Sequence, residues 1–131
     1  MIVLDASAVV AVLVSLGHGA ERIRKRMETG ESLHVPHVMD LEVLHALRRQ
    51  TLLGTLSSER SAEAIEDLQS LVFVRYPHST FLNRIWSLRN NLTAYDAAYV
   101  ALAEALDATL VTMDARLAQA PGIRATVEVY G

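Results

Sequence analysis

The sequence contains no cysteine, and only one of its 12 basic residues, Lys25, is a lysine. Without cysteine there are no disulfides, no thiolate metal sites and no cysteine nucleophiles, so we expect an intracellular, cytoplasmic protein. A single lysine leaves little scope for Schiff-base chemistry or for lysine capture of phosphate. No apolar run approaches the roughly 18 residues of a membrane span, and Met1 is not followed by the basic region of a signal peptide. We therefore expect no membrane association.

Signatures of several other enzyme classes are also missing. The chain has neither a G-x-G-x-x-G run nor a Walker loop, which leaves nucleotide cofactors without support. Ser7 lacks the G-x-S-x-G elbow of a serine hydrolase. The five histidines do not show the i, i+4 spacing of a zinc helix. These absences leave the acidic residues as the main candidates for chemistry.

The charge of the chain argues against binding nucleic acid by bulk electrostatics. The formal net charge is −3 at pH 7, whereas neutralising a phosphate backbone requires clustered cations. Two local clusters exist, Arg22-x-Arg24-Lys25-Arg26 and Arg48-Arg49. Either could contact phosphate or an acidic partner, and the simpler interpretation of the first cluster is a solvated helix face.

The length of 131 residues and the 51% hydrophobic content predict a single domain, residues 1–131, with its own core. Apolar periodicity alternates between strands and helices, which favours an α/β fold with a mostly parallel sheet covered on both sides. Ser7, Thr80 and Thr93 are plausible helix N-caps. Strands are predicted at 2–4, 33–35, 72–74, 109–112 and 126–129, and helices at 8–16, 20–28, 37–51, 59–71, 80–88, 93–106 and 114–119.

Four acidic residues stand where such a fold would gather them. Asp5 and Asp114 each follow an apolar strand, and Glu42 and Asp96 each open a helical pattern. In open α/β sheets, ligands bind in the crevice at the carboxyl ends of the strands. Clustered carboxylates bind hard cations, and hard cations bind phosphates. We therefore predict a metal site built from these four side chains.

Each acid also has a purely structural interpretation. Asp5 and Asp114 could be turn or N-cap residues, and Asp96 stands third after Thr93 as in a capping box. For Asp96 this interpretation is weakened, because the helix that follows it is apolar all round, which makes a carboxylate at its mouth costly unless it is paired or binds a cation.

Glu42 is the most ambiguous acid, because it shares a polar helical stripe with His45 and Arg49 like any solvent-facing glutamate. Asp40 falls near the middle of the apolar arc and is better explained by the helix dipole. It is the substitute if Glu42 is not a ligand.

Neighbouring side chains add detail to this prediction. The hydroxyls of Ser7 and Thr112, two residues from Asp5 and Asp114, could orient carboxylates or waters. The stripe of Tyr95, Tyr99 and Leu102 is most simply core, and Trp86 with Phe81 and Leu82 could be core or a pairing surface.

The combined motifs resemble the PIN-domain ribonucleases, in particular the VapC toxin branch of bacterial and archaeal toxin–antitoxin pairs. The resemblance spans nearly the whole chain and rests on the order and spacing of its motifs. These are Met1-Ile-Val-Leu-Asp5-Ala-Ser7, Glu42 in an early helix, Tyr95-Asp96-Ala97-Ala98-Tyr99 and Leu110-Val-Thr112-Met-Asp114.

The resemblance implies a three-layer α/β/α PIN domain with a central, mostly parallel sheet of four to five strands. It further implies that Asp5, Glu42, Asp96 and Asp114 hold Mg²⁺ or Mn²⁺, with Ser7 and Thr112 near the metal. The implied activity is hydrolysis of RNA phosphodiesters by a metal-activated water. The implied partners are an RNA substrate, a second copy in a homodimer and a VapB-like antitoxin.

Two other functions remain open at this stage. A receiver or phosphoryl-transfer domain also places acids at strand ends, but the third strand is followed by Arg75-Tyr76-Pro77 and not by a phosphoacceptor aspartate. A non-catalytic PIN-like interaction module need not retain all four acids, and here all four positions are filled. For the metal-free protein we expect at least one carboxylate to have a raised pKa, because four nearby negative charges repel one another.

Overall fold

In the computed structural model, which describes residues 1–131, five short strands form one sheet in the order β3-β2-β1-β4-β5. Every neighbouring pair is parallel. The strands are β1 (Ile2–Leu4), β2 (Leu33–Pro36), β3 (Phe73–Tyr76), β4 (Thr109–Thr112) and β5 (Val127–Val129). The predicted α/β class and five-stranded parallel sheet are confirmed. A receiver domain is excluded on topology, because flavodoxin-like folds of that type have the strand order 2-1-3-4-5.

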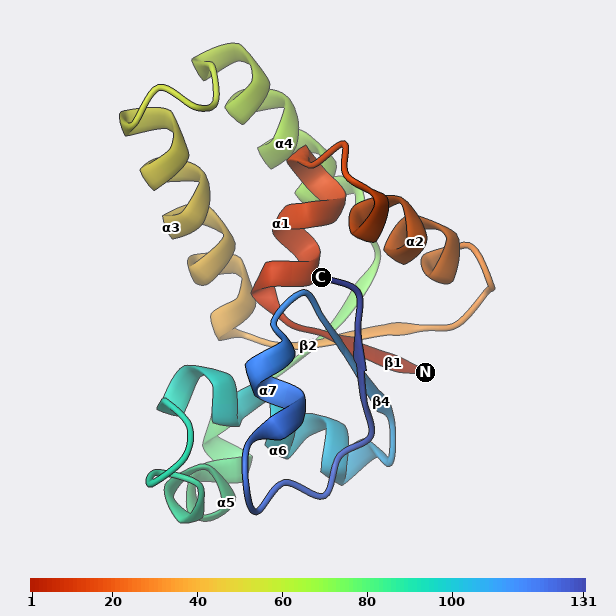
Figure 1. Cartoon of the computed structure of the whole chain (residues 1–131), viewed down its shortest axis with the longest axis vertical. Coiled ribbons are helices and arrows are strands. Elements are labelled where there is room, and N and C mark those ends of the chain that lie inside the picture. The colour runs from red at the N-terminus through yellow and green to blue at the C-terminus, as the bar shows by residue number, and fades with distance from the viewer.

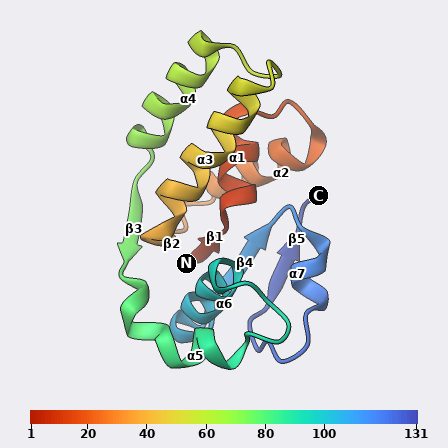
Figure 2. The same cartoon turned by 90° about the vertical axis from the view of Figure 1, so that its left-hand side faces the viewer.

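The helices form two groups on opposite sides of the sheet (Figures 1 and 2). One group follows β1 and β2, and the other follows β3 and β4. From β1 to β3 the chain moves toward one edge of the sheet, and from β3 to β5 it moves toward the other edge. Because crossovers between parallel strands are right-handed, this change of direction puts the two groups of helices on opposite faces. The first group is α1 (Ala6–Val14), α2 (His18–Met27), α3 (Val38–Leu52) and α4 (Ser58–Ser70). The second is the 3₁₀ turn η1 (His78–Phe81), α5 (Leu82–Ser87), α6 (Ala94–Leu106) and α7 (Ala115–Gln119).

The core lies between the sheet and the helices that cover it. It comprises 25 buried apolar residues, including the whole of β1. Helix α6 supplies an uninterrupted buried run, Ala97–Ala103, which confirms the prediction of a helix that is apolar all round. Its small alanines allow the helix backbone to approach β1, β2 and β4 closely.

Most predicted elements agree with the structure to within two residues, and two predicted caps are wrong. Helix α1 starts at Ala6 because Asp5, and not Ser7, is its N-cap and accepts a hydrogen bond from the Ala8 amide at 2.9 Å. Thr80 lies inside the 3₁₀ turn that follows Pro77 and caps nothing. Thr93 is the N-cap of α6, as predicted.

The basic cluster on α2 serves the fold. The Arg24 guanidinium donates to the carbonyls of Val12 and Ser15, at 2.8 and 2.6 Å, and so satisfies groups left free at the end of α1. Arg26 pairs with Glu31 and Glu128. The predicted solvated helix face is therefore wrong for these two arginines, and neither is free for phosphate. No single helix is long and apolar enough to cross a membrane, and only the bent pair α1 and α2, at 102°, has the required length and composition.

A buried histidine makes the stability of the fold pH-dependent. His34 is 5% exposed, and its ring nitrogens contact Ser32 Oγ at 2.7 Å and Tyr76 Oη at 2.6 Å. Burial, with a smaller contribution from the positive N-terminus, lowers the pKa of His34. The unfolded chain therefore takes up this proton more readily than the folded one. Stability that is present above the ordinary histidine pKa is lost as the pH falls below it.

We predict that the free energy of unfolding falls between pH 7 and pH 5 by up to about 1.4 kcal/mol per pH unit from this group. His34→Gln keeps hydrogen-bonding capacity but cannot titrate, so its pH dependence should be flatter. Urea unfolding at three pH values measures this. His18→Gln, at an exposed position, should retain the wild-type dependence, and identical slopes in all three proteins would contradict the prediction.

Candidate active site

The candidate site lies at the carboxyl ends of β1 and β4, where the direction of the strand order reverses. Leu4 of β1 pairs with Val111 of β4, and the Asp5 amide donates to the Val111 carbonyl at 3.1 Å. The crossovers that leave β1 and enter β4 run on opposite faces of the sheet, which opens a crevice between these strands. Asp5, directly after β1, and Asp114, two residues after the end of β4, follow neighbouring strands at this edge.

Asp5 is held in place by three donors. It is 6% exposed; one carboxylate oxygen accepts from the Ala8 amide at 2.9 Å and from Ser7 Oγ at 2.6 Å, and the other accepts from the Thr112 hydroxyl. The same hydroxyls are fixed by the backbone of the β4–α7 turn, because Met113 N donates to Ser7 Oγ and Asp114 N donates to Thr112 Oγ1, both at 3.0 Å. The predicted Ser7 and Thr112 hydroxyls therefore do contact a site carboxylate.

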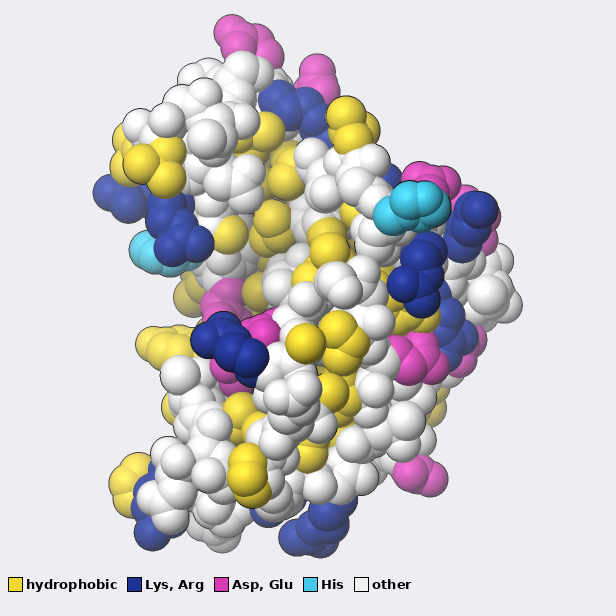
Figure 3. Space-filling model, viewed as in Figure 1, with side chains coloured by type: hydrophobic (Ala, Val, Ile, Leu, Met, Phe, Trp, Pro, Cys, Tyr) yellow, Lys and Arg dark blue, Asp and Glu magenta, His cyan; other side chains and the backbone are white.

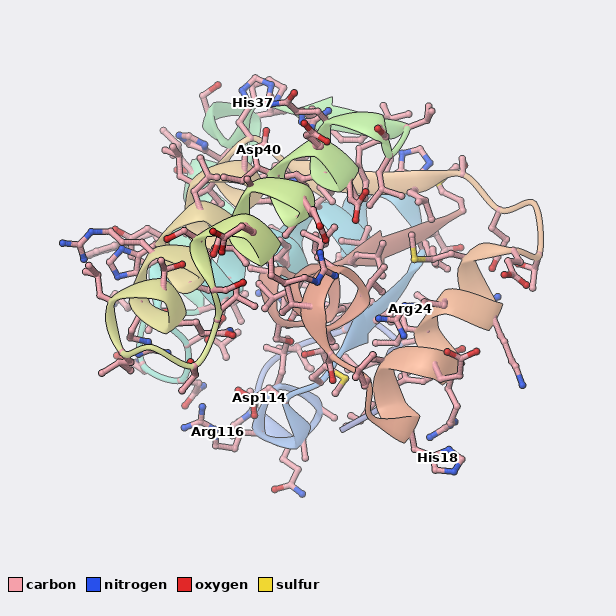
Figure 4. All side chains as sticks on the ribbon, turned by 90° about the horizontal axis from the view of Figure 1, so that it is seen from above. His18, Arg24, His37, Asp40, Asp114 and Arg116 are labelled. Atoms are coloured by element: carbon pink, nitrogen blue, oxygen red, sulfur yellow. The ribbon has the colours of Figure 1, made fainter.

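Glu42 reaches the site from the second turn of α3. It is half-buried and accepts a hydrogen bond from the Tyr99 hydroxyl of α6 at 2.6 Å. Asp40 instead forms a bidentate ion pair with Arg75, at 2.8 and 2.9 Å. It lies on the opposite side of the molecule from Asp114 in the view of Figure 4. The prediction that Asp40 falls near the middle of the apolar arc is wrong, because Leu44 is 40% exposed and the buried face of α3 is limited to Met39, Val43 and Leu47.

The four carboxylates influence one another electrostatically. Burial raises the pKa of Asp5, and the charge of Asp96 raises it further against the hydrogen bonds from Ser7, Thr112 and Ala8. Burial also raises the pKa of Glu42, with added effects from Asp96 and Asp5 that the Tyr99 hydrogen bond opposes. For Asp96, burial and then the charge of Asp114 raise the pKa, against the hydrogen bond from Thr93 and the charge of Arg116. The charges of the four predicted acids are therefore coupled, and three of the four are destabilised as anions.

Asp114 differs from the other three. The Arg116 side chain donates to both of its carboxylate oxygens, at 3.1 and 3.0 Å, and holds the pKa of Asp114 below its usual range. Figure 4 shows the two side chains together at the end of α7, and in Figure 3 a basic side chain lies over the acidic group in the central hollow. None of the eight ion pairs in the structure involves Asp5, Glu42 or Asp96.

The chemistry of this donor set suits a hard divalent cation. All its ligating atoms are oxygens, and three desolvated carboxylates form no ion pair, although the charge of Arg116 acts on Asp96. As the side chains stand, however, no three histidine, aspartate or glutamate residues are arranged as a metal site. Two of the four acids are engaged elsewhere, Glu42 with Tyr99 and Asp114 with Arg116. The residue types fit a cation, and two of the four side chains make other contacts in this structure.

A cavity that sequence reasoning missed adjoins the acids. It has a volume of about 550 Å³ and shares Glu42 with the acidic cluster. Its other lining residues include His45 and Arg49, which follow Glu42 on one face of α3, and Tyr95. Tyr95 is 59% exposed, so its prediction as core is wrong, whereas Tyr99 and Leu102 are core as predicted. The sequence feature that could have indicated the cavity is the polar stripe of Glu42, His45 and Arg49 on α3, because these side chains line the cavity and do not simply face bulk solvent.

Comparison with known proteins identifies relatives along the whole chain. The family model of the PIN domain matches residues 2–123. Ribonuclease VapC1 of Mycobacterium tuberculosis is 46% identical over 129 residues, which cover 97% of this chain and 96% of that protein. The crystal structure of PAE2754 from Pyrobaculum aerophilum has a TM-score of 0.71 at 26% identity and covers 97% of this chain and 82% of that one. The crystal structure of VapBC2 from Rickettsia felis, bound to a promoter DNA fragment, has a TM-score of 0.71 at 15% identity, with full coverage of both chains.

Proposed function

This chain belongs to the VapC branch of the PIN-domain family, and we propose that it is a metal-dependent endoribonuclease, the toxin of a toxin–antitoxin pair. The observation that carries the proposal is a set of three desolvated carboxylates that form no ion pair and whose charges act on one another, beside the reversal point of a parallel sheet. Such a site lacks only a cation to be electrostatically balanced. A site of this kind suits phosphate chemistry because a hard cation bound by carboxylates keeps positions for substrate oxygens.

We assign the cation, Mg²⁺ or Mn²⁺, to Asp5, Glu42, Asp96 and Asp114. When bound, such an ion lowers the pKa of a coordinated water and offsets negative charge at the phosphodiester. The chain's own contribution is to fix the ligands. Ser7 and Thr112 lock the Asp5 carboxylate, and Tyr99 orients Glu42.

The proposed reaction is attack of water on an RNA phosphodiester, which leaves a 5′-phosphate and a 3′-hydroxyl and forms no covalent intermediate. No side chain in the site is poised as a nucleophile, because the Ser7 hydroxyl donates to Asp5 and accepts from Met113. The cavity beside Glu42 gives the RNA a path to the acids. Arg49 and His45 would face its phosphates, and the exposed ring of Tyr95 offers a surface for a base.

The test is cleavage of total RNA by the purified protein with Mg²⁺ or with chelator. We expect discrete fragments with 5′-phosphate ends in Mg²⁺ and at least a 100-fold slower reaction with chelator. Cleavage that proceeds equally with chelator would exclude a metal-dependent activity. The non-catalytic interaction module has no observation in its favour, since all four acids are present and interact.

We also propose a homodimer formed through α5. Leu82 and Trp86 of this helix are 57% and 67% exposed, and an apolar cavity of about 260 Å³ beside them is lined by Val38, Ile85 and Tyr95. This surface adjoins the acidic site, because Val38 and Tyr95 line both cavities. A twofold contact here would place two sites along one groove.

Leu82→Asp should convert this dimer to a monomer, because burying an unpaired carboxylate at the interface is costly. Equilibrium sedimentation at micromolar concentration measures the mass. Val72→Asp, a matched change at an 85% exposed position on the β3 side, should leave the dimer intact. A wild-type protein that is monomeric at this concentration would contradict the dimer.

The partner that we propose for regulation is a VapB-like antitoxin. The support is the VapC identity of the relatives, together with an acidic site that a basic side chain of a partner could fill in place of the cation. Purified toxin and antitoxin should co-elute in gel filtration, and RNA cleavage should fall as antitoxin is added.

A further inference from the structure

Arg116 is the only basic residue that forms an ion pair with any of the four acids. Its Nε and Nη2 donate to the two oxygens of Asp114 at 3.1 and 3.0 Å, which is the bidentate geometry that a guanidinium makes with a carboxylate. In the metal-free protein, one of the proposed ligands is thus already bound to a cation that the chain itself supplies.

The exposed position of the Arg116 side chain allows it to move away from Asp114. Its side chain is 90% exposed, whereas that of Asp114 is 34% exposed, so nothing packs the guanidinium in position. Exposed ion pairs contribute little to stability. The helix does not depend on the pair either, because the Arg116 backbone amide separately donates to Asp114 Oδ1 at 3.0 Å and forms the N-cap of α7. The side chain can therefore swing away while α7 stays folded.

The alternative occupant of Asp114 is the cation of the proposed function. Three other carboxylates in the crevice form no ion pair, and Asp114 is the one proposed ligand that a basic side chain holds. The pair is formed within a D-x-R segment, so release requires rotation of one side chain and no movement of the sheet. Once released, an exposed guanidinium stands beside the place where an RNA phosphate must approach the acids.

We propose that Arg116 is a resident counter-ion that holds Asp114 in the metal-free protein, is displaced when the divalent cation binds, and then binds a phosphate of the RNA. This inference rests on the proposed function and deepens it. It assigns one residue two opposite effects: Arg116 weakens metal binding and strengthens substrate binding.

The first test is titration with MnCl₂, measured by calorimetry, on the wild-type protein, Arg116→Ala and Arg116→Lys. Displacement predicts that both variants bind Mn²⁺ about two- to fivefold more tightly than wild type, because each loses the bidentate pair. A simple effect of net charge would instead leave Arg116→Lys equal to wild type. Arg22→Ala removes the same charge from α2, where the guanidinium lies 4.8 Å from the Tyr130 ring, and should bind Mn²⁺ like wild type.

The second test follows the side chain and the substrate. The NMR signal of the Arg116 Nε–H, identified by its absence in Arg116→Ala, should shift as Mg²⁺ is added. RNA cleavage by Arg116→Ala should show a raised KM and a kcat/KM at least about tenfold lower, despite tighter metal binding, with partial rescue in Arg116→Lys.

The outcomes separate this inference from the function on which it rests. If wild type and both variants fail to bind Mn²⁺, the proposed metal-dependent function fails. If all bind Mn²⁺ equally and the Nε–H signal does not move, the displacement of Arg116 is wrong while the nuclease stands. Unchanged KM and kcat/KM in Arg116→Ala would overturn the phosphate contact alone.

Discussion

Asp96→Asn should abolish RNA cleavage and at the same time make the metal-free protein more stable. Cleavage should fall by about 1,000-fold, since one of four proposed ligands is lost at the reacting centre. Stability should rise because burial and the charge of Asp114 disfavour the Asp96 anion, and an amide of the same shape removes that charge. Helix α6 should be unaffected, because its cap uses the Asp96 backbone amide, which donates to Thr93 Oγ1 at 3.1 Å.

The gain should be small, about 0.5 kcal/mol or about 2 °C in Tm, because Asp96 is only half-buried and its charge is partly screened. It should also depend on pH. The pKa of Asp96 is raised in the folded state, so the unfolded chain releases this proton at a lower pH than the folded protein does. The wild-type carboxylate therefore lowers the free energy of unfolding as the pH rises through the folded pKa, and it has no effect below the ordinary aspartate range. The advantage of the variant therefore exists at pH 7 and disappears in acid.

Thermal unfolding in chelator, followed by a cleavage assay in Mg²⁺, measures both effects. Asp67→Asn removes the same charge from an exposed position of α4 and should change neither. A variant that unfolds at a lower temperature at pH 7 and still cleaves RNA would show that Asp96 is a structural cap residue.

Glu42→Gln and Asp40→Asn should separate the two acids of α3. Glu42→Gln should reduce cleavage by about 1,000-fold, because Glu42 is desolvated and feels the charges of Asp96 and Asp5. Asp40→Asn should leave cleavage within about twofold, because its carboxylate is paired with Arg75 beside β3. The expected cost of the second change is at most about 1 kcal/mol of stability, since the pair is about one-third exposed.

Both variants remove one negative charge from the same helix, so each is the control for the other. Initial rates with one RNA substrate in Mg²⁺, together with urea unfolding, distinguish them. Equal losses of cleavage would mean that the charge of α3 matters and the position does not. A larger loss in Asp40→Asn would make Asp40 the second acid of the site.

The sequence by itself determined the sheet and the principal acids. Strand β1 and the Ala97–Ala103 run of helix α6 are wholly apolar, so their burial leaves little freedom in how they pack. Asp5 and Asp114 lie within two residues of the ends of their strands, and the parallel direction of β1 and β4 then places them at one edge. The local sequence pattern was enough here, because a residue that follows a parallel strand must lie at the carboxyl edge of the sheet, where open α/β sheets bind ligands.

Only the tertiary structure decided the contacts that depend on the angle between elements. Glu42 and Asp40 point about 160° apart around the axis of α3, so only one of them can face the crevice. The hydrogen bond that places Glu42 there comes from Tyr99 of α6, 57 residues further along the chain. Tyr95 has the spacing of a core residue, but it is exposed and lines a cavity together with residues of α3. Likewise, Arg24 became a cap for α1 because α2 folds back on it. Local periodicity fixes which face of a helix is apolar, whereas the neighbours that meet its remaining polar atoms are set by packing between elements far apart in the chain.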